Sequence, residues 1–349
     1  MFKSANVGSS HSSHKISSQH AFLLLAATTI LLLYLTTLQT DVSGSPSEYT
    51  LDTGEFQNAL SLWGTLHHTG YPLYSLLGSP FVGVVRALGA TPAMAASLFS
   101  LLWAMGTLAM VVVLVEELGG RRLVGVTAAL LLAATHSFWL HSVIAEVYSL
   151  ALFLVALTLW LTLRCRRDPT RLPWLGLLLG LAVGLHRASL LLVPASAFYL
   201  LLQPEVRRAA SWQRLVKTAL AFLAAFVVYL WLPLRAMQGA AWLFARPDTW
   251  EGFWGVFFGS EVRHLMVPER DPGMLWRNLL DALRVLRVEL TAGGLVAGAV
   301  GLGLTLLDRR RARQALFLVV VGVAFLLFAA VFPLAVFLPA LLLPSLLVA

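Results

Sequence analysis

Hydrophobic residues along this chain gather in long runs that short polar segments separate. Most of the runs approach the roughly 20 apolar residues that a helix needs to cross a bilayer. We therefore predict an all-α polytopic membrane protein, with an uncleaved first helix because no small-residue cleavage site follows the first run. The runs are Ala21–Leu38, Pro92–Leu118, Leu123–Val143, Val147–Leu163, Leu172–Leu202, Val216–Leu234, Leu290–Leu307, Ala315–Phe332 and Leu334–Ala349.

The run Leu172–Leu202 is too long for one simple span. As a single helix it would measure about 46 Å at 1.5 Å per residue, whereas the hydrocarbon layer is about 30 Å thick. His186 and Arg187 interrupt it near its middle. We predict a hairpin of two short helices with this pair at a buried apex, which brings the expected bundle to about 10 membrane helices.

The distribution of basic residues predicts the sidedness. Sixteen of the 25 Lys and Arg residues lie in the N-terminal segment or near 121–122, 164–171, 204–215 and 308–313. The positive-inside rule places these segments in the cytoplasm. Residues 1–20 then form a disordered cytoplasmic N-terminus, and residues 21–349 form one transmembrane domain. The external loops are 40–91 and 236–289. Both are too long to be simple connectors, so we expect function on the outer face.

Composition excludes several classes of protein. The chain is 58% hydrophobic and only 12% charged, whereas soluble domains carry about 25% charged residues. A soluble enzyme, a disordered regulator and a disulfide scaffold are therefore excluded. The net charge of +8 does not indicate nucleic acid, because the basic residues fall in short clusters between apolar runs. P-loop, GxGxxG and HExxH signatures are absent from the sequence.

The first external loop carries a pair of carboxylates. Asp52 and Glu55 are three residues apart at the start of a segment whose apolar residues form one stripe, which is typical of a helix lying in the membrane interface. Two hypotheses fit. Asp52 at the N-cap with Glu55 at N3 is a capping-box pattern, and a carboxylate can also serve as a general base. The following segment 70–88, which contains two prolines, is expected to lie along the outer surface.

Further polar residues follow these carboxylates. His67, His68 and Tyr71 come next in the loop. They suit hydrogen bonding to a substrate or filling of the interface. Metal binding by the two histidines is disfavoured, because adjacent side chains diverge. Glu146 and Tyr148 follow the third run. An acidic side chain near the membrane edge is costly unless it is paired or solvated, so Glu146 marks either a site or a surface turn.

Arg187 is the most informative cation. An arginine at the apex of a broken membrane helix indicates a functional site, and its guanidinium matches phosphate oxygens. The alternative is a structural partner for a buried carboxylate such as Glu146. Arg235 follows the run Val216–Leu234, where it suits either a second phosphate contact or snorkelling.

The second external loop holds an aromatic cluster. Its members recur at helical spacing after start signals at Pro247 and Asp248. This predicts an interfacial helix that either anchors the loop or walls a site for a lipid chain or a sugar ring. The aromatic residues are Trp250, Phe253, Trp254, Phe257 and Phe258.

Five short motifs in order resemble the bacterial protein-O-mannosyltransferase-like family of polytopic GT-C glycosyltransferases, which is similar to the vertebrate transmembrane protein O-mannosyltransferases. The resemblance extends over roughly residues 20–290. The motifs are Asp52-Thr53-Gly54-Glu55-Phe56, His68-Thr69-Gly70-Tyr71-Pro72-Leu73-Tyr74, Glu146-Val147-Tyr148, Gly184-Leu185-His186-Arg187, and Leu232-Pro233-Leu234-Arg235 with Trp242 and Pro247-Asp248-Thr249-Trp250 after it.

This resemblance implies a GT-C-like fold and a glycosyltransferase. The enzyme would move a mannose-like hexose from a polyprenyl-phosphate donor to a hydroxyl of a protein, lipid or glycan. It implies no cofactor beyond the donor and leaves a divalent metal open, without assigning a metal ligand or a nucleic-acid partner. The expected location is a bacterial inner membrane, with the active site on the periplasmic side.

The expected mechanism assigns roles to named residues. Asp52 is the general base, and Glu55 orients the acceptor or supports Asp52. Two other readings stay open. A transporter or flippase would use the midplane arginine, although the sequence has no inverted repeat, and an assembly subunit would need neither carboxylate. The expected substrate contacts are His67, His68, Tyr71, Glu146, Tyr148, His186, Arg187 and Arg235.

Overall fold

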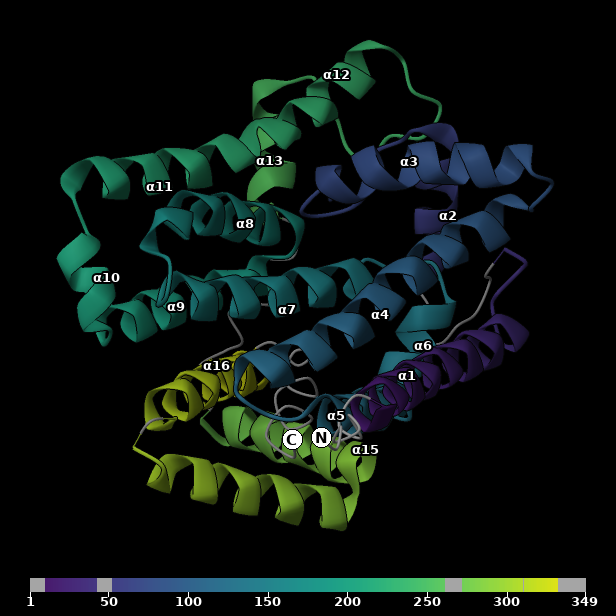
Figure 1. The fold of residues 1–349 in the computed structure, drawn as a ribbon. Helices are drawn as coiled ribbons and strands as arrows, with labels where there is room; N and C mark the ends of the chain where they lie inside the picture. Colours follow the sequence, from purple (N-terminus) through teal and green to yellow (C-terminus); the bar gives the residue numbers. More distant parts are fainter. Residues whose placement is uncertain (1–9, 43–51, 261–271, 310, 332–349) are drawn as a thin grey trace, which may run out of the picture.

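The computed structural model describes residues 10–42, 52–260, 272–309 and 311–331. Within these ranges the regular elements are helices without strands (Figure 1), which confirms the all-α prediction. The helices are α1 (Ser10–Thr36), α2 (Thr53–Leu62), α3 (Pro72–Ala87), α4 (Pro92–Glu117), α5 (Arg122–Ala133), α6 (His136–Val143), α7 (Tyr148–Cys165), η1 (Pro169–Arg171), α8 (Leu172–Leu185), η2 (Arg187–Leu191), α9 (Leu192–Leu201), α10 (Pro204–Ala209), α11 (Trp212–Ala224), η3 (Ala225–Leu230), α12 (Trp231–Met237), α13 (Trp250–Phe258), α15 (Pro272–Leu307) and α16 (Ala312–Val331).

Five of the described helical segments are long and apolar enough to cross a membrane. They are Pro92–Glu117, Tyr148–Cys165, Trp212–Met237, Gly273–Leu307 and Ala312–Val331. The fourth, which belongs to α15, is broken at Thr291 (φ 58°, ψ 165°) into two helices. The bent pair α5 and α6 would make a sixth span, and Ala21–Thr36, Pro169–Leu185 and Arg187–Leu201 are shorter apolar helices. The prediction of several membrane helices is confirmed. The run Leu334–Ala349 lies outside the described residues, so the count of about 10 spans stays a prediction.

The predicted run Leu123–Val143 is not one straight helix. It divides into α5 and α6, which are bent by 75°. Thr135 between them is extended, with φ −73° and ψ 139°, and its hydroxyl donates to the Leu132 carbonyl (2.7 Å). The Glu289 carboxylate on α15 accepts hydrogen bonds from the backbone N–H and the hydroxyl of Ser137. The start of α6 is therefore held by a distant helix.

The N-terminal helix also begins earlier than predicted. α1 begins at Ser10, whereas disorder was expected as far as residue 20. From Ala21 onward this helix has the predicted apolar composition. The polar residues ahead of it continue the same helix, whereas the sequence favours a disordered segment there.

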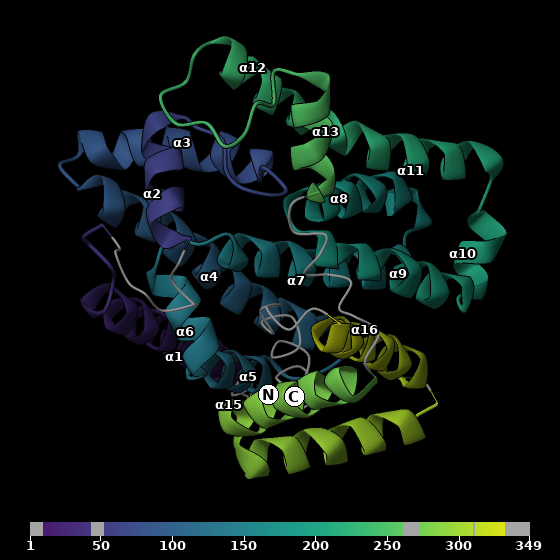
Figure 2. The same ribbon diagram turned by 180° about the vertical axis from the view of Figure 1, so that it is seen from behind.

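The predicted hairpin at 172–202 is confirmed. α8 ends at Leu185, His186 is extended (φ −141°, ψ 120°), and the chain continues through η2 into α9. η1 before α8 contacts α10 after α9, so the two open ends of the hairpin lie together. α8 packs between α7 and α11, as both views show (Figures 1 and 2).

The segments predicted to be cytoplasmic meet at one end of the bundle. The buried Glu117 carboxylate forms ion pairs with Arg164 (2.6 Å) and Arg167 (3.1 Å). Arg311 donates to the Gly119 carbonyl (3.3 Å). At the other end, the Thr91 hydroxyl donates to the Thr40 carbonyl (2.7 Å). The grouping of loops by charge therefore agrees with their positions in the fold.

The segment 70–88 forms α3, which packs on α2 and α4. In both views α3 runs in roughly the same direction as α7 (Figures 1 and 2). Tyr74 and Ser75 on this helix are fully buried. α3 is therefore part of the packed bundle, whereas the sequence favoured a segment lying flat along the outer surface.

Candidate active site

The first of the two loops predicted to be external folds back on itself at the end of α2. Phe56, Ala59 and Leu60 form the apolar stripe of this helix and are fully buried. α2 therefore packs its apolar stripe against α3 and α4, and its predicted position in the membrane interface stays a prediction. Trp63 ends the helix in the left-handed region (φ 56°, ψ 40°). The chain then returns along α2, so that His67 lies beside the first turn of the helix.

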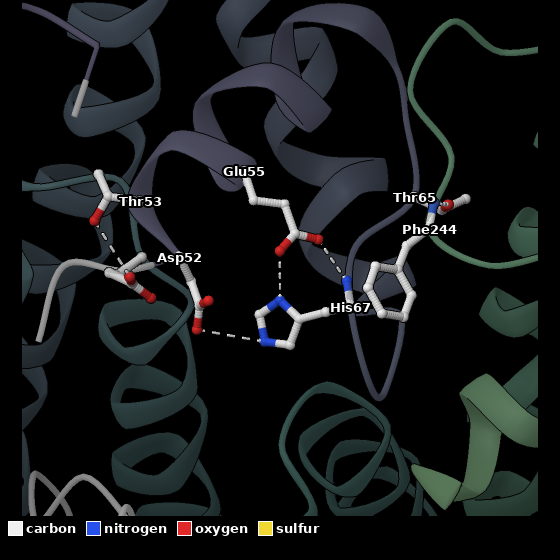
Figure 3. A network of polar contacts seen from close by, with 7 residues as sticks. Asp52, Thr53, Glu55, Thr65, His67 and Phe244 are labelled. Carbon is white, nitrogen blue, oxygen red and sulfur yellow. Dashed lines mark hydrogen bonds and ion pairs between the residues drawn. The ribbon is translucent and has the colours of Figure 1, made fainter. Parts of the chain in front are cut away.

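This reversal places His67 between the two predicted carboxylates (Figure 3). Glu55 accepts hydrogen bonds from the backbone N–H of His67 (2.6 Å) and from its ring Nδ1 (2.8 Å). The other ring nitrogen, Nε2, lies 3.6 Å from Oδ2 of Asp52. The Asp52 side chain is 51% exposed, whereas that of Glu55 is 18% exposed. Asp52 is therefore the carboxylate that is freer to meet a substrate.

The capping-box hypothesis is not realised. Asp52 occupies the N-cap position of α2 but its side chain makes no capping hydrogen bond. Both oxygens of Glu55 are instead engaged by His67. The sequence gives no local signal for this pairing, because the two residues are 12 positions apart and are joined by a non-glycine reversal.

The two carboxylates act on the pKa of His67. Burial alone lowers the pKa of this imidazole, because it disfavours the charged form. The hydrogen bond that the ring donates to Glu55 and the negative charges of Glu55 and Asp52 outweigh burial and raise the pKa of His67 above its usual value. His67 is therefore a basic group held inside an acidic cluster.

The same cluster is the candidate metal site among the described residues. The ligand atoms of Asp52, Glu55 and His67 all lie within 4.8 Å of one another. Carboxylates and imidazole suit a divalent cation, but Glu55 and His67 already satisfy each other by hydrogen bonding. His68 is not a member of this cluster, and its ring contacts Phe244.

The second predicted external loop packs against the first through Trp242 and Phe244. The Thr65 backbone N–H donates to the Trp242 carbonyl (3.1 Å), and the Phe244 N–H donates to the Thr65 hydroxyl (2.8 Å). The Phe244 ring then meets His67 and His68 edge-on, with centroid distances of 6.3 Å and 5.1 Å. Thr65 and Phe244 belong to the site although no sequence motif indicated either of them.

Glu146 lies on the other side of the α2 start. Its side chain is buried, and its Oε1 accepts from the Thr53 hydroxyl (3.4 Å). Its backbone N–H donates to the Ser100 hydroxyl (3.1 Å). Burial raises the pKa of this carboxyl well above its usual range, and the charge of Asp52 adds to the effect. The alternative of an exposed charge in a surface turn is therefore wrong.

Arg187 starts η2 at the apex of the hairpin. Its Nη1 donates to the Val183 carbonyl (2.9 Å) and its Nη2 to the Phe257 carbonyl (2.6 Å). The guanidinium also lies over the rings of Tyr229 (5.3 Å) and Phe257 (4.8 Å). Within the described part of the chain no carboxylate forms an ion pair with it. The alternative of a Glu146–Arg187 pair is therefore wrong.

Aromatic side chains occupy the space between the acidic cluster and Arg187. Tyr71 contacts the rings of Phe56 (5.8 Å) and His67 (5.3 Å), and burial raises the pKa of its phenol well above the usual range. Tyr148 contacts His186 (5.9 Å). The structure thus brings most of the predicted contact residues to one region.

Gly70 permits the close approach that closes this region. Its φ of +80° favours glycine, and an added Cβ would lie 2.8 Å from Cδ1 of Leu232 on α12. Arg235 on the same helix reaches a different part of the loop, since it donates to the Trp63 carbonyl (2.6 Å) and to Gln238 (2.6 Å). Arg235 therefore joins the two external loops.

Comparison with known proteins supports the family resemblance that the five sequence motifs indicate. Residues 52–209 match the family model described as the protein O-mannosyl-transferase TMEM260 N-terminal domain. The chain is also 27% identical over 246 residues to mouse protein O-mannosyl-transferase TMEM260, which covers 64% of this chain and 32% of the mouse protein. The matched region thus spans about a third of the length of that relative. The predicted resemblance is confirmed: over these segments the chain is similar to the TMEM260-type protein O-mannosyltransferases.

Proposed function

We propose that this chain is a membrane glycosyltransferase of the GT-C type, which moves a sugar from a polyprenyl-phosphate donor to a hydroxyl acceptor. The observation that carries the proposal is the position of Asp52. Its carboxylate is half exposed beside the His67–Glu55 pair, within the segment that matches the O-mannosyl-transferase family. A general base must be accessible to the acceptor and must be held in position by its neighbours. Asp52 is exposed, and the hydrogen-bonded His67–Glu55 pair lies beside it.

In the proposed reaction Asp52 takes the proton of the acceptor hydroxyl. The acceptor oxygen forms a bond to the anomeric carbon of the sugar, and the bond from that carbon to the phosphate oxygen breaks. The electron pair leaves with the polyprenyl phosphate. Positive charge near this oxygen favours its departure, which is the role we assign to Arg187.

The contacts of Arg187 support this role. A guanidinium has five N–H donors, and the hydrogen bonds to the carbonyls of Val183 and Phe257 use one donor each of Nη1 and Nη2. The group is half-buried and lacks a carboxylate partner among the described residues, so its charge is available to an anion. Arginine forms paired hydrogen bonds with phosphate. His186 and Arg235 are proposed as secondary contacts to the donor.

The sugar and the acceptor would lie between these two ends of the site. His68, Tyr71 and Tyr148 offer ring faces and polar atoms in this region, and α13 presents exposed aromatic surface through Trp250 and Phe258. We assign a mannose-like hexose by analogy with the named activity of the mouse relative. The site would face the outer side of a bacterial inner membrane, with a protein, lipid or glycan as acceptor. No cofactor beyond the donor is invoked.

The experiment that tests this function is a donor panel. Purified protein in lipid nanodiscs is incubated with labelled polyprenyl-phosphate mannose, glucose or galactose, and release of free polyprenyl phosphate is measured together with sugar transfer. We expect turnover of at least one donor and none with nucleotide sugars. A protein that moves the lipid across a vesicle membrane without cleaving any donor would support a flippase instead.

A further inference from the structure

The position of the His67 ring is fixed by several contacts. Glu55 accepts one hydrogen bond from the backbone N–H of His67 (2.6 Å) and a second from the ring Nδ1 (2.8 Å). The rings of Phe56, Tyr71 and Phe244 contact three sides of it at centroid distances of 5.8, 5.3 and 6.3 Å. The imidazole therefore cannot flip without breaking these contacts.

This fixed orientation defines the ring chemistry. A carboxylate at Nδ1 favours the tautomer that carries its proton there. The lone pair of Nε2 is then directed toward Oδ2 of Asp52, 3.6 Å away. That distance is longer than a hydrogen bond, but the Asp52 side chain is half exposed and makes no capping bond, so it is free to close the gap. Catalytic hydrogen bonds are often long before substrate binds.

We propose that His67 is a positioning residue that receives the acceptor proton from Asp52, with Glu55 fixing the ring and balancing its charge. The proposal rests on the proposed glycosyl transfer and replaces the expected role of His67 as a substrate contact. It also gives Glu55 a defined task, which is to orient His67 rather than to bind the acceptor.

The proton can be followed through the whole step. The acceptor hydroxyl gives its proton to Asp52 while its oxygen bonds to the sugar carbon and the polyprenyl phosphate leaves with the electron pair. Asp52 then passes the proton to Nε2 of His67 and becomes an anion again. The resulting imidazolium lies between two carboxylates. Its proton returns through the exposed Asp52 to water, which resets the site.

The pH dependence distinguishes this role from a packing role. The charged and titratable groups that face His67 are Asp52, Glu55 and Tyr71; Phe56 and Phe244 are uncharged. Only neutral His67 can accept a proton, and the carboxylates raise its pKa above the usual value. The rate of transfer should therefore fall as the pH is lowered. The midpoint of this acid limb of the pH–rate profile should lie above about pH 6.5.

Two variants move this acid limb in different ways. Glu55→Gln removes the negative charge at Nδ1, so the pKa of His67 falls and the limb moves to lower pH. His67→Gln removes the titrating group, so the limb disappears and transfer drops by about 10²-fold. His136→Gln is the matched control, because His136 is an exposed histidine whose ring contacts Trp139 in α6, away from the site.

The experiment records kcat/KM against pH in nanodiscs for the wild-type protein and for Glu55→Gln, His67→Gln and His136→Gln. Asp52→Asn is measured as a further sample. A His67→Gln variant that keeps the wild-type acid limb overturns the proposal. So does wild-type activity that a chelator abolishes and Mn²⁺ restores, because a metal would then link the three groups. If His67→Gln does not fold, the shift in Glu55→Gln decides. Failure of the proposed function itself looks different: the wild-type protein cleaves no donor, or Asp52→Asn keeps full activity.

Discussion

Nη2 of Arg187 donates to the backbone carbonyl of Phe257 (2.6 Å) across 70 residues of sequence. The bond joins the apex of the α8–α9 hairpin to the end of α13 in the second external loop. An outer loop therefore closes onto the cation that we assign to the donor phosphate. The position of this cation therefore depends on a contact between two segments that no local sequence pattern connects.

Replacing Arg187 should affect donor affinity before it affects folding. Arg187→Lys keeps the charge but loses the planar fork, so we expect KM for the lipid-linked donor to rise at least tenfold, or about 1.4 kcal/mol, with a smaller change in kcat. Arg284→Lys is the control, because Arg284 is an exposed arginine paired with Asp281 on α15. Equal KM values for both variants and the wild-type protein would contradict the role of Arg187.

Glu146 should make stability depend on pH. Its folded pKa is raised by burial, so the native state holds a proton that the unfolded chain loses near pH 4.5. Stability is then fully present below that pH and falls as pH rises toward the folded pKa, by at most about 1.4 kcal/mol per pH unit. Glu146→Gln should flatten this slope in thermal unfolding. Glu251→Gln, an exposed change, should leave the slope as in the wild-type protein.

Phe244 should matter for catalysis through the two histidines it covers. Phe244→Ala removes the ring that meets His67 and His68 and admits water to the pair. We expect transfer to fall about tenfold, in line with supporting residues around a site. Leu243→Ala is the neighbouring control, because Leu243 is exposed. Phe244→Tyr should retain activity, and a loss there equal to that in Phe244→Ala would argue against simple ring packing.

The sidedness of the loops can be tested by labelling. Ala210→Cys lies in the predicted cytoplasmic segment and Ala241→Cys in the second external loop, and both positions are exposed. The native Cys165 is buried and should give little background. In intact cells a membrane-impermeant thiol reagent should modify Ala241→Cys alone. Modification of Ala210→Cys instead would invert the topology.

The helices were predictable because their signals are local. Each run of apolar residues is enough to predict a helix. The break at His186–Arg187 was predictable because the run Leu172–Leu202 is longer than a single helix needs to cross the bilayer. The bend between α5 and α6 was not predictable, since no proline or glycine marks Thr135 and the contact with Glu289 lies 152 residues away. Bends that tertiary contacts create leave no local pattern.

The candidate site divides in the same way. The sequence predicts four of the candidate functional residues from their chemistry and their place between apolar runs: Asp52, Glu55, His67 and Arg187. Their partners were not found, because Glu55 meets His67 only after the chain reverses at Trp63, a non-glycine residue with positive φ. Thr65 and Phe244 enter the site through hydrogen bonds between the two predicted external loops, each of which is donated by a backbone N–H. Patterns of side chains along the sequence cannot reveal such contacts.

The role of Asp52 as the general base is tested most directly by the transfer rate of Asp52→Asn in nanodiscs, measured beside Asp41→Asn and with donor binding recorded separately. Asparagine keeps the shape of the side chain but removes its basicity, so transfer should fall by about 10²–10⁴-fold while donor binding and thermal stability stay near wild type. Asp41→Asn, an exposed change in the same loop, should transfer normally. Wild-type transfer by Asp52→Asn would contradict the account.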